Sequence, residues 1–405
     1  SAALSLVRAG IKTYLVEKSE RLGGMVKRLS TVWPSMKGGQ EMVESLIGEL
    51  TRRDDVEIFL SSEVKGFDGF PGGFVVRLST PEGEREFKVG GAIIAIGAKP
   101  FDPTIKGEFL YGREDRVITT LEFEEAFHEG FFSKRSPRVA IIQCVGSRDE
   151  GINRPYCSRI CCINAAKTAK RIRDLYPEAR VEIFYMDVRT FPRGGEEFYE
   201  EVQRCGVYYT RSNIGEMYPT PQGVMLRGED TLLGEVFERE FDLVVLSIGL
   251  DPPEDNHEVA RIFKLNLDKD GFFLEAHVKL RPFDTARKGV YIAGCCVGPK
   301  DASDALTQGR AAAMKLFSFL SAGMAVVEPM KAEVNQDRCS GCRLCERVCI
   351  GDALSFDDVQ QVVKVNEMAC SGCGLCASIC PSSAITLKGY TDPIIGGEVS
   401  GILEV

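Results

Sequence analysis

The chain has 405 residues, of which 44% are apolar, and a formal net charge of −9. This length is enough for two or three folded domains, and the composition excludes a disordered protein. The acidic balance argues against nucleic acid as a partner. The apolar stretches are too short or too interrupted to cross a membrane, and we expect neither a membrane-inserted segment nor a signal peptide.

The start of the chain has the pattern of a dinucleotide-binding unit. SAALSLVRAG has helical spacing and ends in Gly10, and the strand IKTYLVEK that follows closes on Glu17. In such a unit the acid at the end of the second strand binds a ribose hydroxyl. The first strand and its glycine loop would precede Ser1, so we expect the chain to begin inside the unit. Next, RLGGM places Gly23 and Gly24 in a turn whose backbone can approach adenosine or flavin closely.

Two later segments, residues 88 to 100 and 236 to 253, each run from a strand-rich stretch into a buried strand that closes on Ile-Gly. Gly97 ends the first of them. Both resemble the strand-to-glycine motif of flavoprotein reductases that have two dinucleotide-binding domains. A strand, a glycine turn and a long helix follow at residues 288 to 320.

In that superfamily the strand ends in Gly-Asp, and the Asp reaches toward the ribityl-phosphate of the flavin. Here Gly294 is present, but Cys295 stands at the Asp position. We therefore expect other groups at the start of the next helix to face the flavin. The candidates are Asp301 and the backbone amides of Ser303, Asp304 and Ala305.

Between the two flavin-domain segments, the strand RVAII leads into QCVGSRDEGINRPYCSRICC and then a helix. A domain that bound NAD(P)H would have a glycine-rich loop at this turn. Instead it holds Cys144, Cys157, Cys161 and Cys162, with Gly146 as the only glycine close to the strand end. Four thiolates suit an iron-sulfur cluster or zinc, while buried structural thiols are the alternative. On a regular helix the last two cysteines point about 100° apart, so both can be ligands only if the turn is irregular.

The strongest motif lies near the C-terminus. CSGCRLCERVC and CSGCGLCASICP repeat the spacing of a two-cluster ferredoxin, in which the fourth cysteine of each run binds the other cluster. A zinc site does not need this run twice, and of the fifteen cysteines these eight indicate metal in a reducing cytoplasm rather than disulfides. The predicted ligand sets are Cys339, Cys342, Cys345 and Cys380 for one cluster, and Cys349, Cys370, Cys373 and Cys376 for the other.

QCVGSRD, YCSRICC, the helix with Lys167 and GCCVGPKD together resemble HdrA, the iron-sulfur flavoprotein of heterodisulfide reductase, whose family occurs in anaerobic archaea and bacteria. The resemblance implies that the four cysteines of the inserted domain hold a [4Fe-4S] cluster beside the FAD, where thioredoxin-reductase-like relatives bind NADPH. It also favours Lys167 as a residue that reaches the flavin edge and shifts its redox potential. The alternative is an ordinary surface lysine.

The fold class expected is α/β, a thioredoxin-reductase-like flavoprotein with two dinucleotide-type domains, plus a C-terminal α+β ferredoxin domain with two [4Fe-4S] clusters. Methanogen members carry an N-terminal cluster domain and often a ferredoxin module inside the flavin domain; here the strand at residues 74 to 97 runs through without one, which indicates a shorter variant or a fragment. The expected parts are FAD domain 1–100, inserted domain 101–253, FAD domain resumed 254–323, linker 321–329, ferredoxin domain 332–388 and extension 389–405.

The sequence thus predicts an oxidoreductase subunit with one FAD and three [4Fe-4S] clusters that works within a complex. By resemblance, FAD would take electron pairs from a hydrogenase or formate dehydrogenase module and split them between ferredoxin and a disulfide-reducing subunit, and such complexes could pair as dimers. Three alternatives remain open. They are a non-bifurcating relay, an NAD(P)H-dependent reductase like the small subunit of glutamate synthase, and an iron-sulfur scaffold without flavin.

Overall fold

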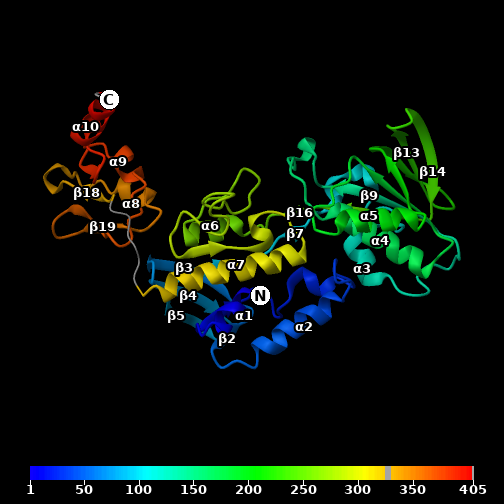
Figure 1. Ribbon diagram of the computed structural model, residues 1–405, viewed down its shortest axis with the longest axis horizontal. Coiled ribbons are helices and arrows are strands. Elements are labelled where there is room, and N and C mark those ends of the chain that lie inside the picture. Colours follow the sequence, from blue (N-terminus) through cyan, green and yellow to red (C-terminus); the bar gives the residue numbers. More distant parts are fainter. Residues whose placement is uncertain (324–329, 404–405) are drawn as a thin grey trace.

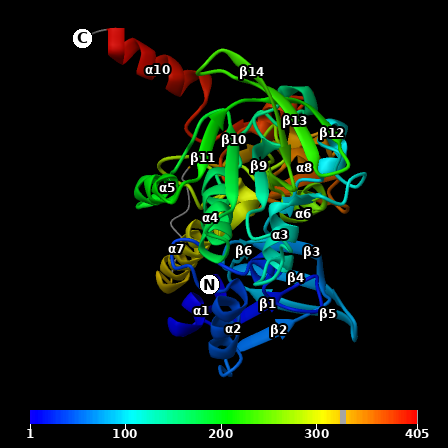
Figure 2. The same ribbon diagram turned by 90° about the vertical axis from the view of Figure 1, so that its right-hand side faces the viewer.

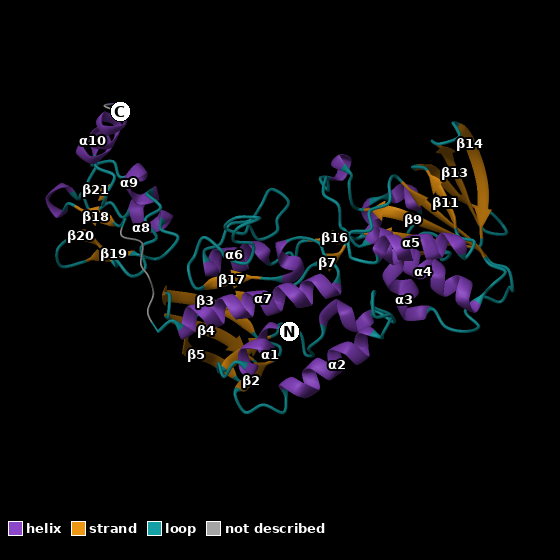
Figure 3. Ribbon diagram, in the orientation of Figure 1, coloured by secondary structure: helices purple, strands orange, loops and turns teal. Residues whose placement is uncertain are grey.

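The computed structural model describes residues 1–323 and 330–403. Three bodies follow one another along its longest axis (Figure 1): an inserted body, a central body and a small C-terminal module. All three mix helices with strands (Figure 3), so the predicted α/β class is correct. Within the described ranges, every helix is too short or too polar to cross a membrane.

The central body combines the start of the chain with residues far along it. The parallel pair β6–β17 and the contact of helix α7 with α1 join these distant stretches, while the parallel pair β1–β2 lies within the first part of the chain. A core rich in phenylalanine, including Phe67, Phe74, Phe263 and Phe273, fills the space beneath the antiparallel sheet β3–β4–β5. The elements are α1 (Ala2–Arg8), β1 (Thr13–Val16), η1 (Gly24–Arg28), α2 (Gly39–Leu50), β2 (Val56–Phe59), β3 (Glu63–Phe70), β4 (Gly73–Thr80), β5 (Gly83–Val89), β6 (Ala92–Ile94), α6 (Asn256–Phe263), β17 (Val290–Ile292), η5 (Gly294–Val297) and α7 (Ala302–Ser321).

The stretch at 74 to 97 therefore contains three strands rather than the one strand expected. Gly83, with φ of 121°, begins β5 directly after the turn that reverses the chain. Left-handed backbone of this kind is accessible to glycine at little cost. As the sequence indicates, no further module interrupts these strands.

The inserted body is a five-stranded parallel sheet in the order β11–β10–β9–β15–β8, with helices against it and the antiparallel sheet β12–β13–β14 at its end. Its strands read as continuous apolar runs because both faces are covered. The elements are β8 (Val117–Thr119), α3 (Thr120–Ala126), β9 (Arg138–Val145), η4 (Glu150–Ile152), α4 (Cys161–Leu175), β10 (Arg180–Tyr185), α5 (Gly195–Arg204), β11 (Tyr208–Arg211), β12 (Ile214–Pro219), β13 (Val224–Asp230), β14 (Glu235–Phe241) and β15 (Leu243–Ile248).

The two crossings between the central and inserted bodies lie side by side. β7 (Lys99–Pro100) pairs in antiparallel fashion with β16 (Leu250–Asp251), and the amide of Phe101 donates to the carbonyl of Gly249 at 3.0 Å. Short 3₁₀ turns η2 (Pro103–Ile105) and η3 (Gly107–Phe109) follow the first crossing. The polypeptide therefore passes between the two bodies through one narrow two-stranded link.

The C-terminal module repeats one pattern twice: a cysteine-rich loop followed by a five-residue helix, α8 or α9. Helix α10 extends away from the body of the molecule (Figure 2), with exposed Ile402 and Leu403 near its end. Of the expected linker and extension, residues 324–329 and 404–405 lie outside the described part. The elements are β18 (Ala332–Val334), η6 (Gln336–Arg338), α8 (Leu344–Val348), β19 (Leu354–Asp357), β20 (Val362–Val365), α9 (Leu375–Ile379), β21 (Ile385–Leu387) and α10 (Asp392–Leu403).

Candidate functional site

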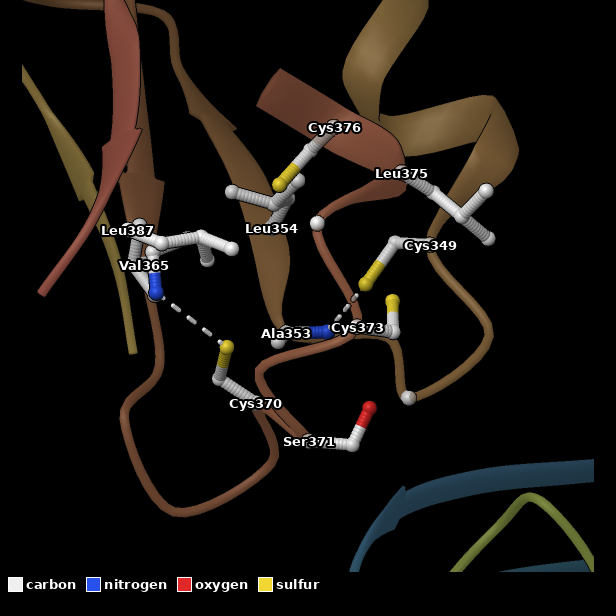
Figure 4. A pocket seen from close by; sticks show the side chains of 13 residues that line it. Cys349, Ala353, Leu354, Val365, Cys370, Ser371, Cys373, Leu375, Cys376 and Leu387 are labelled. Carbon is white, nitrogen blue, oxygen red and sulfur yellow. Dashed lines mark hydrogen bonds between the residues drawn. The ribbon is translucent and has the colours of Figure 1, made fainter. Parts of the chain in front are cut away.

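The second predicted ligand set of the module surrounds one cavity. Cys349, Cys370, Cys373 and Cys376 line it, with Leu354 and Leu387 among the apolar wall, and Figure 4 shows their sulfurs directed into the same space. Cys349 comes from the first cysteine run and the other three from the second. The structure thus brings together the crossed set that the spacing predicts for one cluster.

Backbone amides point at the sulfurs of this module. Ala353 N donates to Cys349 Sγ at 3.2 Å, Ala332 N to Cys370 Sγ at 3.5 Å, and Ala384 N to Cys380 Sγ at 3.3 Å. Such donors stabilise negative charge on thiolate ligands and tune cluster potentials. In the other set, burial raises the pKa of Cys345, and the nearby Cys342 and Cys339 raise it further. Backbone amides thus face sulfurs of both predicted sets, Cys349 and Cys370 in one and Cys380 in the other.

The four cysteines of the inserted body also lie together, at the turn between β9 and α4. Cys144, with φ of 61°, lies at the end of the strand, and α4 begins at Cys161. A hydrogen bond between these two thiols lowers the pKa of Cys144 and raises that of Cys161. Burial, together with the charges of Cys144 and Cys157, raises the pKa of Cys162 to about 11. The four thiols thus lie close enough for the charge of one to shift the pKa of another.

The adjacent cysteines Cys161 and Cys162 begin helix α4. Cys161 and Cys162 occupy the first turn of the helix, after a tight bend in which Ile160 N donates to Ser158 O at 2.7 Å. Cys161 Sγ faces the carbonyl of Ile248 at 3.8 Å, while Cys162 Sγ contacts Gln143 Oε1 at 3.5 Å. Whether both cysteines bind one cluster stays a prediction of the sequence.

Positive charge surrounds this cysteine group, which the sequence motifs do not indicate. Asp187 pairs with Arg148 and, at 3.2 Å, with Arg189. The backbone amide of Arg189 donates to Cys162 Sγ at 3.3 Å, and that of Arg159 to Cys157 Sγ at 3.3 Å. Two guanidinium groups and two N–H donors would stabilise an anionic cluster at this turn.

Within the described ranges, no three Cys, His, Asp or Glu side chains gather closely enough to hold a single metal ion. Around the module cavity the sulfurs enclose a space (Figure 4).

The cysteine turn of the inserted body meets the start of α7 in the central body. Arg159, two residues after Cys157, forms an ion pair with Asp304 at 3.3 Å. Asp301 is the N-cap of α7, and its carboxylate accepts a hydrogen bond from the amide of Asp304 at 2.8 Å. The residues predicted to face the flavin, Ser303 and Ala305 included, thus occupy the helix start nearest to the cysteine turn.

A buried lysine supports the loop before α7. The Lys300 ammonium donates to the carbonyl of Gly294 at 2.8 Å and to that of Gly298 at 2.5 Å, and burial lowers its pKa. The thiol of Cys295 contacts the carbonyl of Lys300 at 3.4 Å, and burial raises its pKa. Lys300 was not predicted from the sequence, where a lysine in a glycine-rich loop has no distinctive spacing. It places a cation close to Cys295.

The remaining predicted flavin contacts lie at strand ends and turns. The Glu17 carboxylate, after β1, accepts from the amide and hydroxyl of Ser19 at 2.8 and 2.7 Å. Gly23 has φ of 121°, and a Cβ there would approach Val43 to 2.8 Å. Gly24 and Gly97 also have positive φ, with open space around them. Part of a bound cofactor could therefore pass close to the protein backbone at these turns.

Lys167 is a buried contact between bodies and not a surface lysine. Its ammonium pairs with Glu124 at 2.8 Å and donates to the carbonyl of Thr31, in the central body, at 2.7 Å. Its side chain is 2% exposed. Burial lowers the pKa of Lys167; burial also opposes ionisation of Glu124, yet Lys167 and Arg171 hold the pKa of that carboxyl below its usual range. Lys167 lies in α4 and its ammonium is paired with Glu124, so its reach toward the flavin edge stays a prediction.

Comparisons with known proteins agree with these features. Residues 338–384 match the family model of a 4Fe-4S dicluster domain. HdrA of Methanocaldococcus jannaschii, an iron-sulfur subunit of CoB–CoM heterodisulfide reductase, is 34% identical over 100% of this chain and 75% of that protein. HdrA of the H2:CoB–CoM heterodisulfide, ferredoxin reductase of Methanothermobacter marburgensis is 33% identical over 88% of this chain and 68% of that protein.

A third similar relative is HdrA of the H2/formate:CoB–CoM heterodisulfide, ferredoxin reductase of Methanococcus maripaludis, 33% identical over 99% of this chain and 75% of that protein. Among solved structures, thioredoxin reductase from T. acidophilum covers 78% of this chain and 93% of its own, with a TM-score of 0.52 and 19% identity. Thioredoxin reductase from Lactococcus lactis gives a TM-score of 0.52 and 20% identity over 79% and 95%. These structures share the fold of the central and inserted bodies.

Proposed function

The chain belongs to the HdrA family of CoB–CoM heterodisulfide reductase, and from that premise we propose that its iron-sulfur and flavin centres bifurcate electrons. The coarser assignment, an iron-sulfur flavoprotein oxidoreductase subunit that transfers electrons, follows from the family and from the dicluster domain. The proposal adds one FAD and three [4Fe-4S] clusters. Two clusters belong to the C-terminal module and one to the β9–α4 turn.

The observation that carries this proposal is the cysteine group at the β9–α4 turn. Nicotinamide dinucleotides need glycine and free backbone amides at such a turn. Here Cys144, Cys157, Cys161 and Cys162 occupy it, and the Arg159–Asp304 ion pair joins it to the start of α7. A cluster at the turn would supply one-electron chemistry next to a flavin that accepts electron pairs.

The protein groups around these centres have separate roles. Arg148 and Arg189, held by Asp187, offset the negative charge of the thiolates. The first turn of α7 and the Lys300 ammonium supply positive potential where the flavin would lie. We propose that Glu17, Gly23, Gly24, Gly97 and Gly294 shape the rest of the cofactor site. Lys167 is proposed to shift the flavin potential from its place at the contact between bodies.

The partners are proposed from the names of the relatives. Those names include H2, formate and ferredoxin as well as the heterodisulfide. For this chain we propose an electron-input module of the hydrogenase or formate dehydrogenase type and two acceptors, which are ferredoxin and a disulfide-reducing subunit. The C-terminal module, at one end of the molecule (Figure 1), would connect the flavin domain to such subunits.

An anaerobic redox titration of the intact complex tests bifurcation. We expect the flavin to take up two electrons in one step, because splitting a pair requires the second electron to leave more readily than the first. Flavin absorbance and iron-sulfur EPR signals are followed together as the potential is lowered. Two well-separated one-electron flavin steps would instead support the simple relay.

A further inference from the structure

Arg287 of the central body is buried, and the carboxylate that pairs with it lies outside its own domain. The side chain of Arg287 is 2% exposed, and its guanidinium lies 4.9 and 5.3 Å from the ring centres of Phe67 and Phe74. It donates to the carbonyls of Phe67 and Phe263 at 3.3 and 3.2 Å. Burial lowers its pKa, although the charges of Asp68 and Cys349 oppose this. A buried guanidinium is costly unless an anion pairs with it.

The pairing anion comes from the C-terminal module. Asp352 Oδ2 lies 3.4 Å from Arg287, while Asp352 Oδ1 pairs with the ammonium of Lys264. Lys264 follows α6 with φ of 53°. The two oxygens of one carboxylate in the module are thus held by two cations of the central body.

The loop that carries Asp352 is also a ligand loop. Asp352 lies three residues after Cys349, and a Cβ at the intervening Gly351 would clash with the carbonyl of Ala369, so the loop is tightly packed. Cys349 lines the cavity with Cys370, Cys373 and Cys376. Its charge acts on both cations, and part of the central body is visible next to this cavity (Figure 4).

We propose that Lys264 and Arg287 form a binding site, the cationic dock, for the loop that carries Asp352. This contact holds the C-terminal module with its Cys349-containing cluster toward the central body. The dock has an electrostatic consequence, which rests on the proposed clusters. Each added electron makes a cluster more negative, so nearby cations favour its reduced form. The Cys349-containing cluster is therefore easier to reduce than it would be in an undocked module, and the other module cluster lacks this effect.

The docking is tested on the anaerobic holoprotein with Asp352→Asn and Lys264→Asn. Both positions have left-handed backbone, which asparagine tolerates. Asp352→Asn removes a charge with little change of shape, while Lys264→Asn removes the ammonium together with most of the side chain that carries it. Lys65→Gln, on the exposed face of β3, is the matched control because its ion pair is with Glu63. We expect amide hydrogen exchange of residues 350–353 and 67–69 to accelerate severalfold in both test variants, and the maximum dimension in small-angle scattering to increase. Unchanged exchange and dimension in both would overturn the dock.

The electrostatic consequence is tested by EPR-monitored redox titration of the same proteins. Lys264→Asn should lower the reduction potential of one module cluster and leave the other unmoved, whereas Lys65→Gln should move neither. Equal shifts of both clusters, or no shift, would overturn the asymmetry. Iron analysis distinguishes failure of the proposed clusters from failure of the dock. A module without iron contradicts the clusters and the predicted difference between their potentials. Hydrogen exchange and small-angle scattering still test the dock in that case.

Discussion

At the residue scale, the cysteines predicted to bind a cluster differ from the other cysteines in their neighbours. Cys162 is buried, and its sulfur accepts a hydrogen bond from the amide of Arg189. Cys205 is only half-buried at the end of α5 and belongs to none of the predicted ligand sets. Cys162→Ala should remove one ligand and with it the cluster at the β9–α4 turn. Iron should fall from about twelve to about eight per chain, since each cluster holds four.

The control for this prediction is Cys205→Ala, which should leave the iron content unchanged. Iron is measured on anaerobically purified complex, together with the number of thiols that a cysteine-specific reagent modifies in the native state. A wild-type content of about eight iron, with the four cysteines of the inserted body open to the reagent, would mean that no cluster occupies this turn.

Lys167 shows the limit of reasoning from spacing at this scale. Its place five residues after Cys162 indicates only which side of α4 it occupies. Its partners, Glu124 on α3 and the carbonyl of Thr31, come from distant parts of the chain. Nothing local in the sequence indicates that the ammonium would be buried between two bodies.

At the scale of elements, the turn between β9 and α4 depends on one glycine. Gly146 has φ of 76°, and a Cβ there would overlap the buried ring of Phe101. Gly146→Ala should therefore destabilise the inserted body by about 3 kcal/mol, the combined cost of overpacking and a left-handed alanine. Iron at the turn should fall as well, because Cys144 lies two residues away.

The matched control is Gly48→Ala in helix α2, where no atom would meet the new Cβ and the backbone is helical. This change should raise stability by up to about 1 kcal/mol. Chemical denaturation followed by circular dichroism compares the two variants with the parent protein. Equal stability of Gly146→Ala and the parent would contradict the packing described for the turn.

The same elements show what the sequence could and could not predict. The helix after the cysteines, the strand before them and the two ferredoxin runs have local patterns, and the structure contains them where these patterns indicate. Arg148 and Arg189 approach the cysteine group from different loops, and Arg287 meets Asp352 across two bodies. Such contacts depend on tertiary packing, so no periodicity in the sequence could have indicated them.

At the scale of the whole molecule, the narrow β7–β16 link places the inserted body so that its cysteine turn meets the start of α7. In the thioredoxin reductase fold the corresponding domain is of the dinucleotide-binding type, which explains why the fold alone would suggest a pyridine-nucleotide reductase. The residues at the turn indicate otherwise. Gly146, which follows the end of β9, is already packed against Phe101.

We therefore expect that neither NADH nor NADPH reduces the flavin directly, whereas reduced ferredoxin or an electron-donating partner protein does. Thiolates at the turn would repel a pyrophosphate, and the side chains of Cys161 and Cys162 occupy the helix start that a dinucleotide would need. Stopped-flow absorbance under strict anaerobiosis, with the FAD-loaded protein and excess nucleotide, measures this. Flavin bleaching by either nucleotide at catalytic rates would favour the NAD(P)H-dependent reductase instead. Reduced ferredoxin is mixed with the same preparation as a control. If ferredoxin bleaches the flavin quickly while the nucleotides bleach it slowly, inactive protein cannot explain the slow reaction.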